Sequence, residues 1–163
     1  MSSWAWNQML QPACREIARP DLSLQEMVDV KLKVDESERQ GSAPIRFSAR
    51  EATFVLREVL RLPMRVDVTD GHLHFEAAMP YRDACYNVDY QGVAEIAGGV
   101  ATLHPAAFHV GDLDVASLAT GPTPIARLAW VSADAMEALG HVESLRVEGS
   151  EIIVDIDDVR AIR

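Results

Sequence analysis

The most regular alternation of apolar and polar residues lies between Met27 and Asp35. Four apolar residues alternate there with charged ones: Val28, Val30, Leu32 and Val34. A period of two residues predicts a β-strand with one buried face and one wet face. We therefore expect Leu32 to lie in the interior and Lys33 to face water.

Three further segments predict β-hairpins, because each combines alternation with a two-residue turn. The turn pairs are Asp70-Gly71, Gly98-Gly99 and Gly149-Ser150. Such turns join antiparallel strands and determine which residues face each other. In the first hairpin, Arg65 to Met79, the turn places Val66 opposite Phe75, so that the apolar pairs share one face. The same rule gives pairs in the other two hairpins: Ile96 with Ala101, and Val147 with Ile152.

The segment from Ser48 to Arg61 predicts an amphipathic helix. Its apolar residues recur at i, i+3 and i+4, which places them on one face. Ser48 and Glu51 have the spacing of a capping box, in which each side chain bonds the other residue's backbone N–H. Pro63 follows the last turn and indicates where the helix must already have ended.

Two other helices are expected with less regular patterns. An N-terminal helix from Trp4 to Arg19 carries one apolar stripe and contains Pro12, which kinks it or begins it. A third helix begins at Thr123-Pro124, a good N-cap and first-turn pair, and runs to about Leu139.

Taken together, these elements predict an α+β fold in a single domain, residues 1–163, with the N-terminal helix, residues 1–20, at its periphery. The strand joins are tight hairpins, which parallel strands cannot use. We expect a curved antiparallel sheet of hairpins packed on two or three amphipathic helices.

Composition excludes several classes of function. The 163 residues include 15 Lys and Arg against 25 Asp and Glu, a net charge of −10. So acidic a chain is unsuited to nucleic acid or to an anionic membrane surface, since both require basic patches. No apolar run approaches the ~20 residues of a transmembrane segment, and no secretory signal is visible at the start.

Candidate chemistry is sparse, and we expect neither an enzyme nor a cofactor. The motifs of common hydrolases, nucleotide-binding folds and zinc peptidases are absent from the sequence. His72, His74 and Glu76 share one face of a predicted strand, which is a pattern that can bind metal. Because a zinc site normally adds recognisable ligand spacing, we expect a solvated polar face there and no metal.

The two cysteines, Cys14 and Cys85, lie outside any recognisable redox or catalytic motif. Lone cysteines are most often buried as small apolar side chains, and this is the default expectation. In an oxidising compartment they could instead pair, but the sequence does not place their Cα atoms.

Aromatic residues supply the candidate ligand-binding positions. Tyr81, Tyr86 and Tyr90 cluster in the sequence and, with Phe54 on the expected helix, could line the mouth of an apolar groove. The favoured alternative is that the tyrosines pack on the core and bond through their hydroxyls.

The order of elements between Ile45 and Ile156 resembles that of the YpmS-type bacterial cell-envelope proteins. The segments that carry the resemblance are FSAREATFVLREVL, YNVDYQGVAEIAGGVATL and FHVGDLDV. Those proteins are similar to half of a tubular lipid-binding fold, a curved antiparallel sheet wrapped on a long helix. Those proteins usually carry an N-terminal membrane anchor, and we expect none within this sequence; it has Ala52-Thr53 where their first helix tends to hold a Leu-Asn pair.

The resemblance implies a non-enzymatic domain that binds a lipid or other apolar ligand between sheet and helix. It also implies the cell envelope if an N-terminal anchor was removed, and otherwise the cytoplasm. The alternative is an interaction or assembly module, in which a strand edge or the Trp4 and Trp6 region docks a protein partner and no small molecule is bound.

Overall fold

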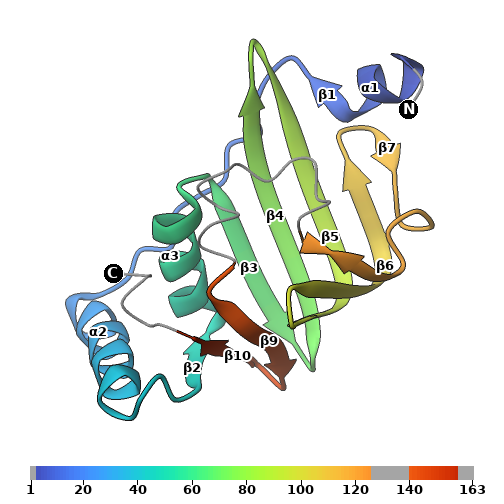
Figure 1. Cartoon of the computed structure of the whole chain (residues 1–163). Helices are drawn as coiled ribbons and strands as arrows, with labels where there is room; N and C mark the ends of the chain where they lie inside the picture. The colour runs from blue at the N-terminus through green and yellow to red at the C-terminus, as the bar shows by residue number, and fades with distance from the viewer. Residues whose placement is uncertain (1–2, 126–139, 158–163) are drawn as a thin grey trace.

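A computed structural model describes residues 3–125 and 140–157 of the chain. Within these residues, three helices accompany ten strands that form one sheet, and every strand pair is antiparallel. The predicted α+β class with a curved antiparallel sheet is therefore confirmed (Figure 1). Among the same residues, no helix is both long enough and apolar enough to span a membrane.

The main path of the sheet runs β2-β10-β9-β5-β4-β3, and β6 extends from β5 to carry β7 and β8. The strands are β1 (Leu10–Gln11), β2 (Ile45–Ser48), β3 (Met64–Thr69), β4 (His72–Tyr81), β5 (Ala84–Ala97), β6 (Val100–Val110), β7 (Leu113–Asp114), β8 (Gly121–Pro124), β9 (Val142–Glu148) and β10 (Glu151–Ile156). Strand β5 connects the β3–β4 part of the sheet to the part formed by β9, β10 and β2, because it pairs with β4 along most of its length and with β9 at its end.

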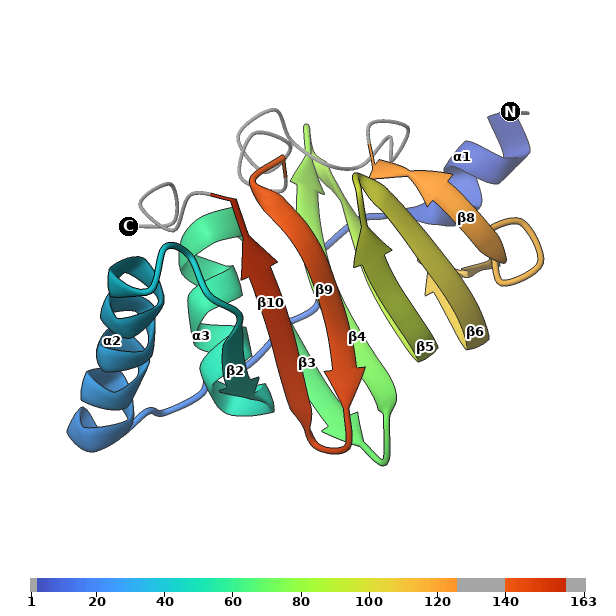
Figure 2. The same ribbon diagram turned by 60° about the horizontal axis from the view of Figure 1, so that its bottom comes forward.

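The sheet bends so that the β9–β10 hairpin lies in front of the β3–β4 hairpin (Figure 2). Their turns meet where the Gly71 N–H donates to the Gly149 carbonyl at 2.8 Å. Helix α3 (Ala49–Leu60) connects β2 to β3, which are the two ends of the main path. It therefore packs across the open side of the bend and covers the core residues on the inner face of the sheet.

All three predicted hairpins are present with the predicted registers. Val66 faces Phe75, Ile96 faces Ala101, and Val147 faces Ile152. Turn chemistry and alternation agree in each of these segments, so a slip by one residue would turn every apolar side chain toward water.

The predicted helix from Ser48 to Arg61 is confirmed as α3. Ser48 is its N-cap and forms the expected capping box with Glu51. Arg61 ends it in the left-handed conformation and donates its backbone N–H to the Arg57 carbonyl. Its last residue, Leu60, lies three positions before Pro63, which could not have continued the helix.

The predicted strand from Met27 to Asp35 is wrong: this segment lies inside helix α2 (Leu24–Arg39). Val30, Val34 and Ser37 follow one another at i, i+4 and i+7 and form the face that packs on the molecule. Leu32 lies on the opposite side and is 54% exposed, so the expected interior position is also wrong. The sequence carries a helix signal that the alternation obscured, since Ser23 and Glu26 form a second capping box.

The expected N-terminal helix from Trp4 to Arg19 is much shorter than predicted. Helix α1 (Ser3–Met9) ends where β1 begins to pair with β5, and Pro12 follows directly. The next residues cross the outer face of the sheet toward α2 without regular structure (Figure 1). We call residues 12–17 of this segment the strap.

A disulfide between Cys14 and Cys85 fixes the strap to β5, with the Cα atoms 5.1 Å apart. Of the two possibilities left open by the sequence, pairing is therefore the one observed; Cys85 is buried as the default expectation held, whereas Cys14 is exposed. Ile17 packs beside the disulfide and Ala78 in a small apolar cluster separate from the main core. Two residues 71 positions apart in sequence meet here only because the strap folds back over the sheet.

Thr123-Pro124 does not begin a helix as expected. Both residues belong to β8, which pairs with β6 so that Thr123 faces Ala101. The rest of the expected helix, to about Leu139, lies outside the described residues.

Candidate functional site

Helices α2 and α3 lie side by side at one edge of the molecule, in both views (Figures 1 and 2). Between them is an open cleft of about 390 Å³, which we call the two-helix cleft. Its apolar lining comes from both helices: Val30 and Val34 from α2, Phe54 and Val55 from α3. Its charged lining consists of Lys31, Asp35 and Glu58.

Ion pairs also join the two helices, through residues that do not line the cleft. Lys33 Nζ donates to Glu51 Oε1 at 2.8 Å, and the Arg50 guanidinium lies 3.2 Å from Glu26 Oε2. Burial alone would raise the pKa of Glu51, but its hydrogen bonds from Lys33 and from the Ser48 backbone outweigh burial and lower that pKa. Glu51 is therefore ionised at neutral pH and joins the two helices at the N-terminal turn of α3.

A second cavity lies on the side of α3 that faces the sheet, and we call it the apolar seam. It has a volume of about 50 Å³, and the eleven described residues that line it are all apolar. Val55, Leu56, Val59 and Leu60 contribute from α3, while Leu145, Ile152 and Val154 are among those from β9 and β10. Val55 lines both cavities, so the two-helix cleft and the apolar seam flank the same turn of α3.

The four aromatic candidates do not converge on one groove. Phe54 lines the two-helix cleft. Tyr81 and Tyr86 pack against each other with ring centroids 5.6 Å apart, and the Trp6 ring lies 6.1 Å from that of Tyr86. Tyr90 is buried in the core, where its ring meets Phe108 edge-on at 5.2 Å.

Tyr86 and Tyr90 are buried against the core, as expected if the tyrosines pack there and do not line a groove. Burial raises the pKa of the Tyr86 and Tyr90 hydroxyls, so both stay protonated near neutral pH. The Tyr90 hydroxyl donates to the Val93 carbonyl within the same strand. Of the four candidates, Phe54 lines a cleft formed by described residues.

The histidine row on β4 divides into two parts. His72 lies near the hairpin turn, where its Nδ1 is 3.3 Å from the Asp70 carbonyl oxygen. His74 and Glu76 instead gather with Asp89 of β5, which stands directly opposite Glu76 in the β4–β5 register. The sequence pattern did not indicate that Asp89 joins this group.

Arg15 of the strap also belongs to this group and was likewise missed. Its guanidinium lies 3.5 Å from Asp89 Oδ2. Its backbone N–H donates to Asn87 Oδ1 at 2.7 Å, and Asn87 in turn donates to the Ala13 carbonyl at 3.0 Å. Alternation along β5 places Asp89 on the polar face, but its pairing with β4 depends on the Arg82-Asp83 turn, which carries no glycine to mark it.

Compared with models of protein families, with curated protein sequences and with solved structures, the chain matches none of them. Its function is therefore inferred from the geometry of its own residues.

Proposed function

We propose that this domain is a non-enzymatic binding protein for a single-chain amphiphile. The apolar end of the ligand occupies the apolar seam, and its headgroup lies in the two-helix cleft. The observation that carries the proposal is the position of Val55, whose side chain lines both cavities. A ligand that passes Val55 can therefore place its two chemically different ends in two chemically different surroundings.

Cavity volumes support this division. The two-helix cleft, at about 390 Å³, falls in the range of small-molecule sites, roughly 300–1,000 Å³. The apolar seam, at about 50 Å³, is roughly a third of the ~150 Å³ cavity that accommodates a benzene molecule. It therefore suits the end of an acyl chain rather than a whole chain.

The charges of the cleft select the headgroup. Two carboxylates, Asp35 and Glu58, and one ammonium, Lys31, are among the residues that line it. The chain as a whole carries a net charge of −10. Both features disfavour an anionic headgroup, so the proposed ligand is zwitterionic or neutral.

The Cys14–Cys85 disulfide supports a location in an oxidising compartment, since such bonds are rare in reducing ones. This agrees with the cell envelope that the YpmS-type resemblance implies, and we propose the envelope over the cytoplasm.

Isothermal titration with a phosphocholine amphiphile of one acyl chain, below its micelle concentration, tests the proposal. We expect one ligand per chain, and weaker binding of a phosphoglycerol amphiphile with the same acyl chain. Val55→Asp should weaken binding by at least about tenfold, because it places a charge at the mouth of the apolar seam. Leu118→Asp is the matched control, since Leu118 is highly exposed in a distant loop.

A second variant guards against misfolding of the first. Glu58 is exposed, so Glu58→Lys should leave the fold intact and shift preference toward the anionic amphiphile. Two results would contradict the proposal. One is that Glu58→Lys and the unmodified protein bind the two amphiphiles with the same preference. The other is that Val55→Asp and Leu118→Asp lose binding affinity to the same extent.

A protein interaction module is the second candidate, and one observation favours it. Trp4 and Trp6 of α1 are 64% and 40% exposed, an unusual position for side chains of this size. If they mediate self-association, light scattering after size exclusion should show a dimer that Trp4→Ser with Trp6→Ser converts to monomer. If the unmodified protein is already a monomer, self-association through α1 is ruled out.

A further inference from the structure

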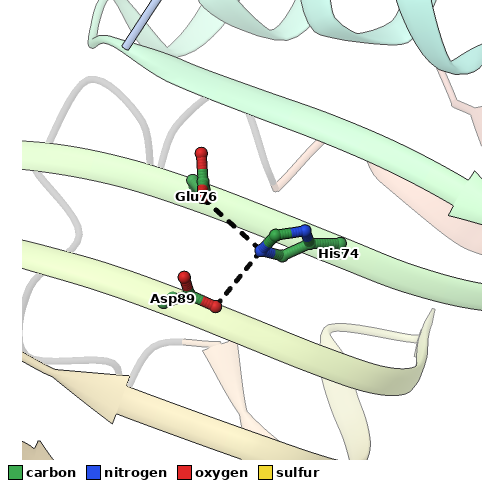
Figure 3. Close-up of side chains that lie close together, drawn as sticks. All are labelled: His74, Glu76 and Asp89. Atoms are coloured by element: carbon green, nitrogen blue, oxygen red, sulfur yellow. Dashed lines mark ion pairs between the residues drawn. The ribbon is translucent and has the colours of Figure 1, made fainter. Parts of the chain in front are cut away.

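Three potential metal ligands from two adjacent strands meet on the outer face of the sheet (Figure 3). His74 Nε2 lies 3.2 Å from Asp89 Oδ1 and 3.6 Å from Glu76 Oε1. One ligand atom from each residue falls within 4.8 Å of the others. Imidazole nitrogen and carboxylate oxygen are both common ligands of zinc.

Two of these three separations are close to those of ligands around a shared ion. Zinc binds imidazole nitrogen at ~2.0–2.1 Å and carboxylate oxygen at ~2.0–2.2 Å. Ligand atoms at such radii around a tetrahedral ion stand about 3.3–3.4 Å apart. The two observed distances, 3.2 and 3.6 Å, lie on either side of this value. We propose that His74, Glu76 and Asp89 form a binding site for one Zn²⁺ ion.

The strand register supports a cation at this position. Glu76 and Asp89 are a directly opposed pair of β4 and β5, so their carboxylates face each other across the two strands. Like charges in this arrangement destabilise a sheet unless a positive charge lies between them. The sheet therefore places two carboxylates where a positive charge is stabilising.

The imidazole supports the same conclusion. His74 Nε2 is buried and has no hydrogen-bond partner among the described residues, although Asp89 is near. A buried polar atom without a hydrogen bond carries a free-energy penalty. Coordination of an ion between Nε2 and the two carboxylates would satisfy it.

Arg15 is the cation that now lies beside the carboxylates. Its guanidinium is 3.5 Å from Asp89 and 3.9 Å from Glu76. The side chain is 49% exposed and can turn toward solvent, while the disulfide of Cys14 and the bond to Asn87 hold its backbone. Zinc would therefore displace only the arginine side chain, and Arg15 competes with the ion.

Competition of the untagged protein with a chromophoric chelator for Zn²⁺ tests the site. We expect one ion per chain, with the affinity lowered at least about a hundredfold in His74→Ala. His72→Ala is the matched control, because His72 lies on the same strand and face but outside the group, and its affinity should not change.

Arg15→Gln separates a metal site from an ion-pair cluster. Loss of the competing charge should tighten Zn²⁺ binding by about tenfold or more, or reveal binding that the unmodified protein lacks. Three results would overturn the proposal: no binding in either protein, weaker binding in Arg15→Gln, or equal losses in His74→Ala and His72→Ala.

Discussion

Replacing Lys33 with Ala should destabilise the protein more than replacing its neighbour Leu32 with Ala. An amphipathic strand at this position would have required the opposite order. In helix α2, Leu32 faces solvent, whereas Lys33 donates to the carboxylate of Glu51. The two substitutions therefore distinguish helix from strand at one place in the chain.

The magnitude follows from the exposure of the two charged side chains. Glu51 is 10% exposed and Lys33 is 38% exposed, so the pair is neither fully buried nor fully solvated. Removing one partner of a buried pair costs ~3–5 kcal/mol, and exposed pairs contribute ~0–1 kcal/mol. We expect about 1–2 kcal/mol for Lys33→Ala. Leu32→Ala should cost under about 0.5 kcal/mol, because alanine favours the helix and little packing is lost.

Urea denaturation of both variants measures the difference in their free energies of unfolding, provided that the dependence on urea concentration stays the same and only the unfolding midpoints move. A double-mutant cycle with Glu51→Gln then isolates the interaction, with an expected coupling of about 1 kcal/mol. Equal free energies of unfolding for the two alanine variants, or a larger loss for Leu32→Ala, would refute the reasoning.

Three further predictions concern pH, the disulfide and one glycine. Folding lowers the pKa of Glu51, so the stabilisation from its ionised carboxylate is complete above the pKa of the unfolded carboxyl and is lost as pH falls through the pKa of the folded carboxyl. The difference in free energy of unfolding between the unmodified protein and Lys33→Ala, measured by urea titration, should therefore narrow between about pH 5 and pH 3. Replacing Cys14 and Cys85 by Ser opens a loop of 71 residues and should lower the free energy of unfolding by about 4 kcal/mol in the chain-entropy account, with an unchanged value arguing against the pairing. Gly92→Ala should lower the free energy of unfolding, measured by calorimetry, by at least about 3 kcal/mol, since its Cβ would lie 2.4 Å from a carbonyl oxygen of β6. Gly98→Ala is the control and should cost about 1 kcal/mol, because the space around Gly98 is open. Similar losses in the two variants would mean that the close approach is not what requires glycine at position 92.

The hairpins could be predicted because their signals are local. Asp70-Gly71 and the alternation on each side of it are separated by a few residues, and both specify the same register. Helix α2 could not be recognised from alternation alone. Val30 and Val34 fit a strand of period two and also a helix with i, i+4 spacing. The capping box of Ser23 decides between them, since it has no role in a strand.

The candidate sites depend on contacts between distant segments, which a single sequence does not specify. His74 and Glu76 could be placed on one face, but Asp89 joins them only through the β4–β5 register and Arg15 only through the strap. The two-helix cleft could not be predicted either, because its charged and apolar walls form only when the segment of α2 is a helix. Phe54 was selected as a groove residue, and it lines a cleft formed with a neighbour that the alternation had assigned to a strand.

The strap also constrains how the protein is made. Cys14 leaves the ribosome 71 residues before its partner, Cys85, which at ~5–20 residues per second is roughly 4–14 seconds of synthesis. During that interval its thiol is available for incorrect pairing or oxidation, and the strand that it will join has yet to emerge. The disulfide can therefore close only after Cys85, at the start of β5, has emerged, so its formation in the growing chain would report that the β3–β4 hairpin has already been synthesised.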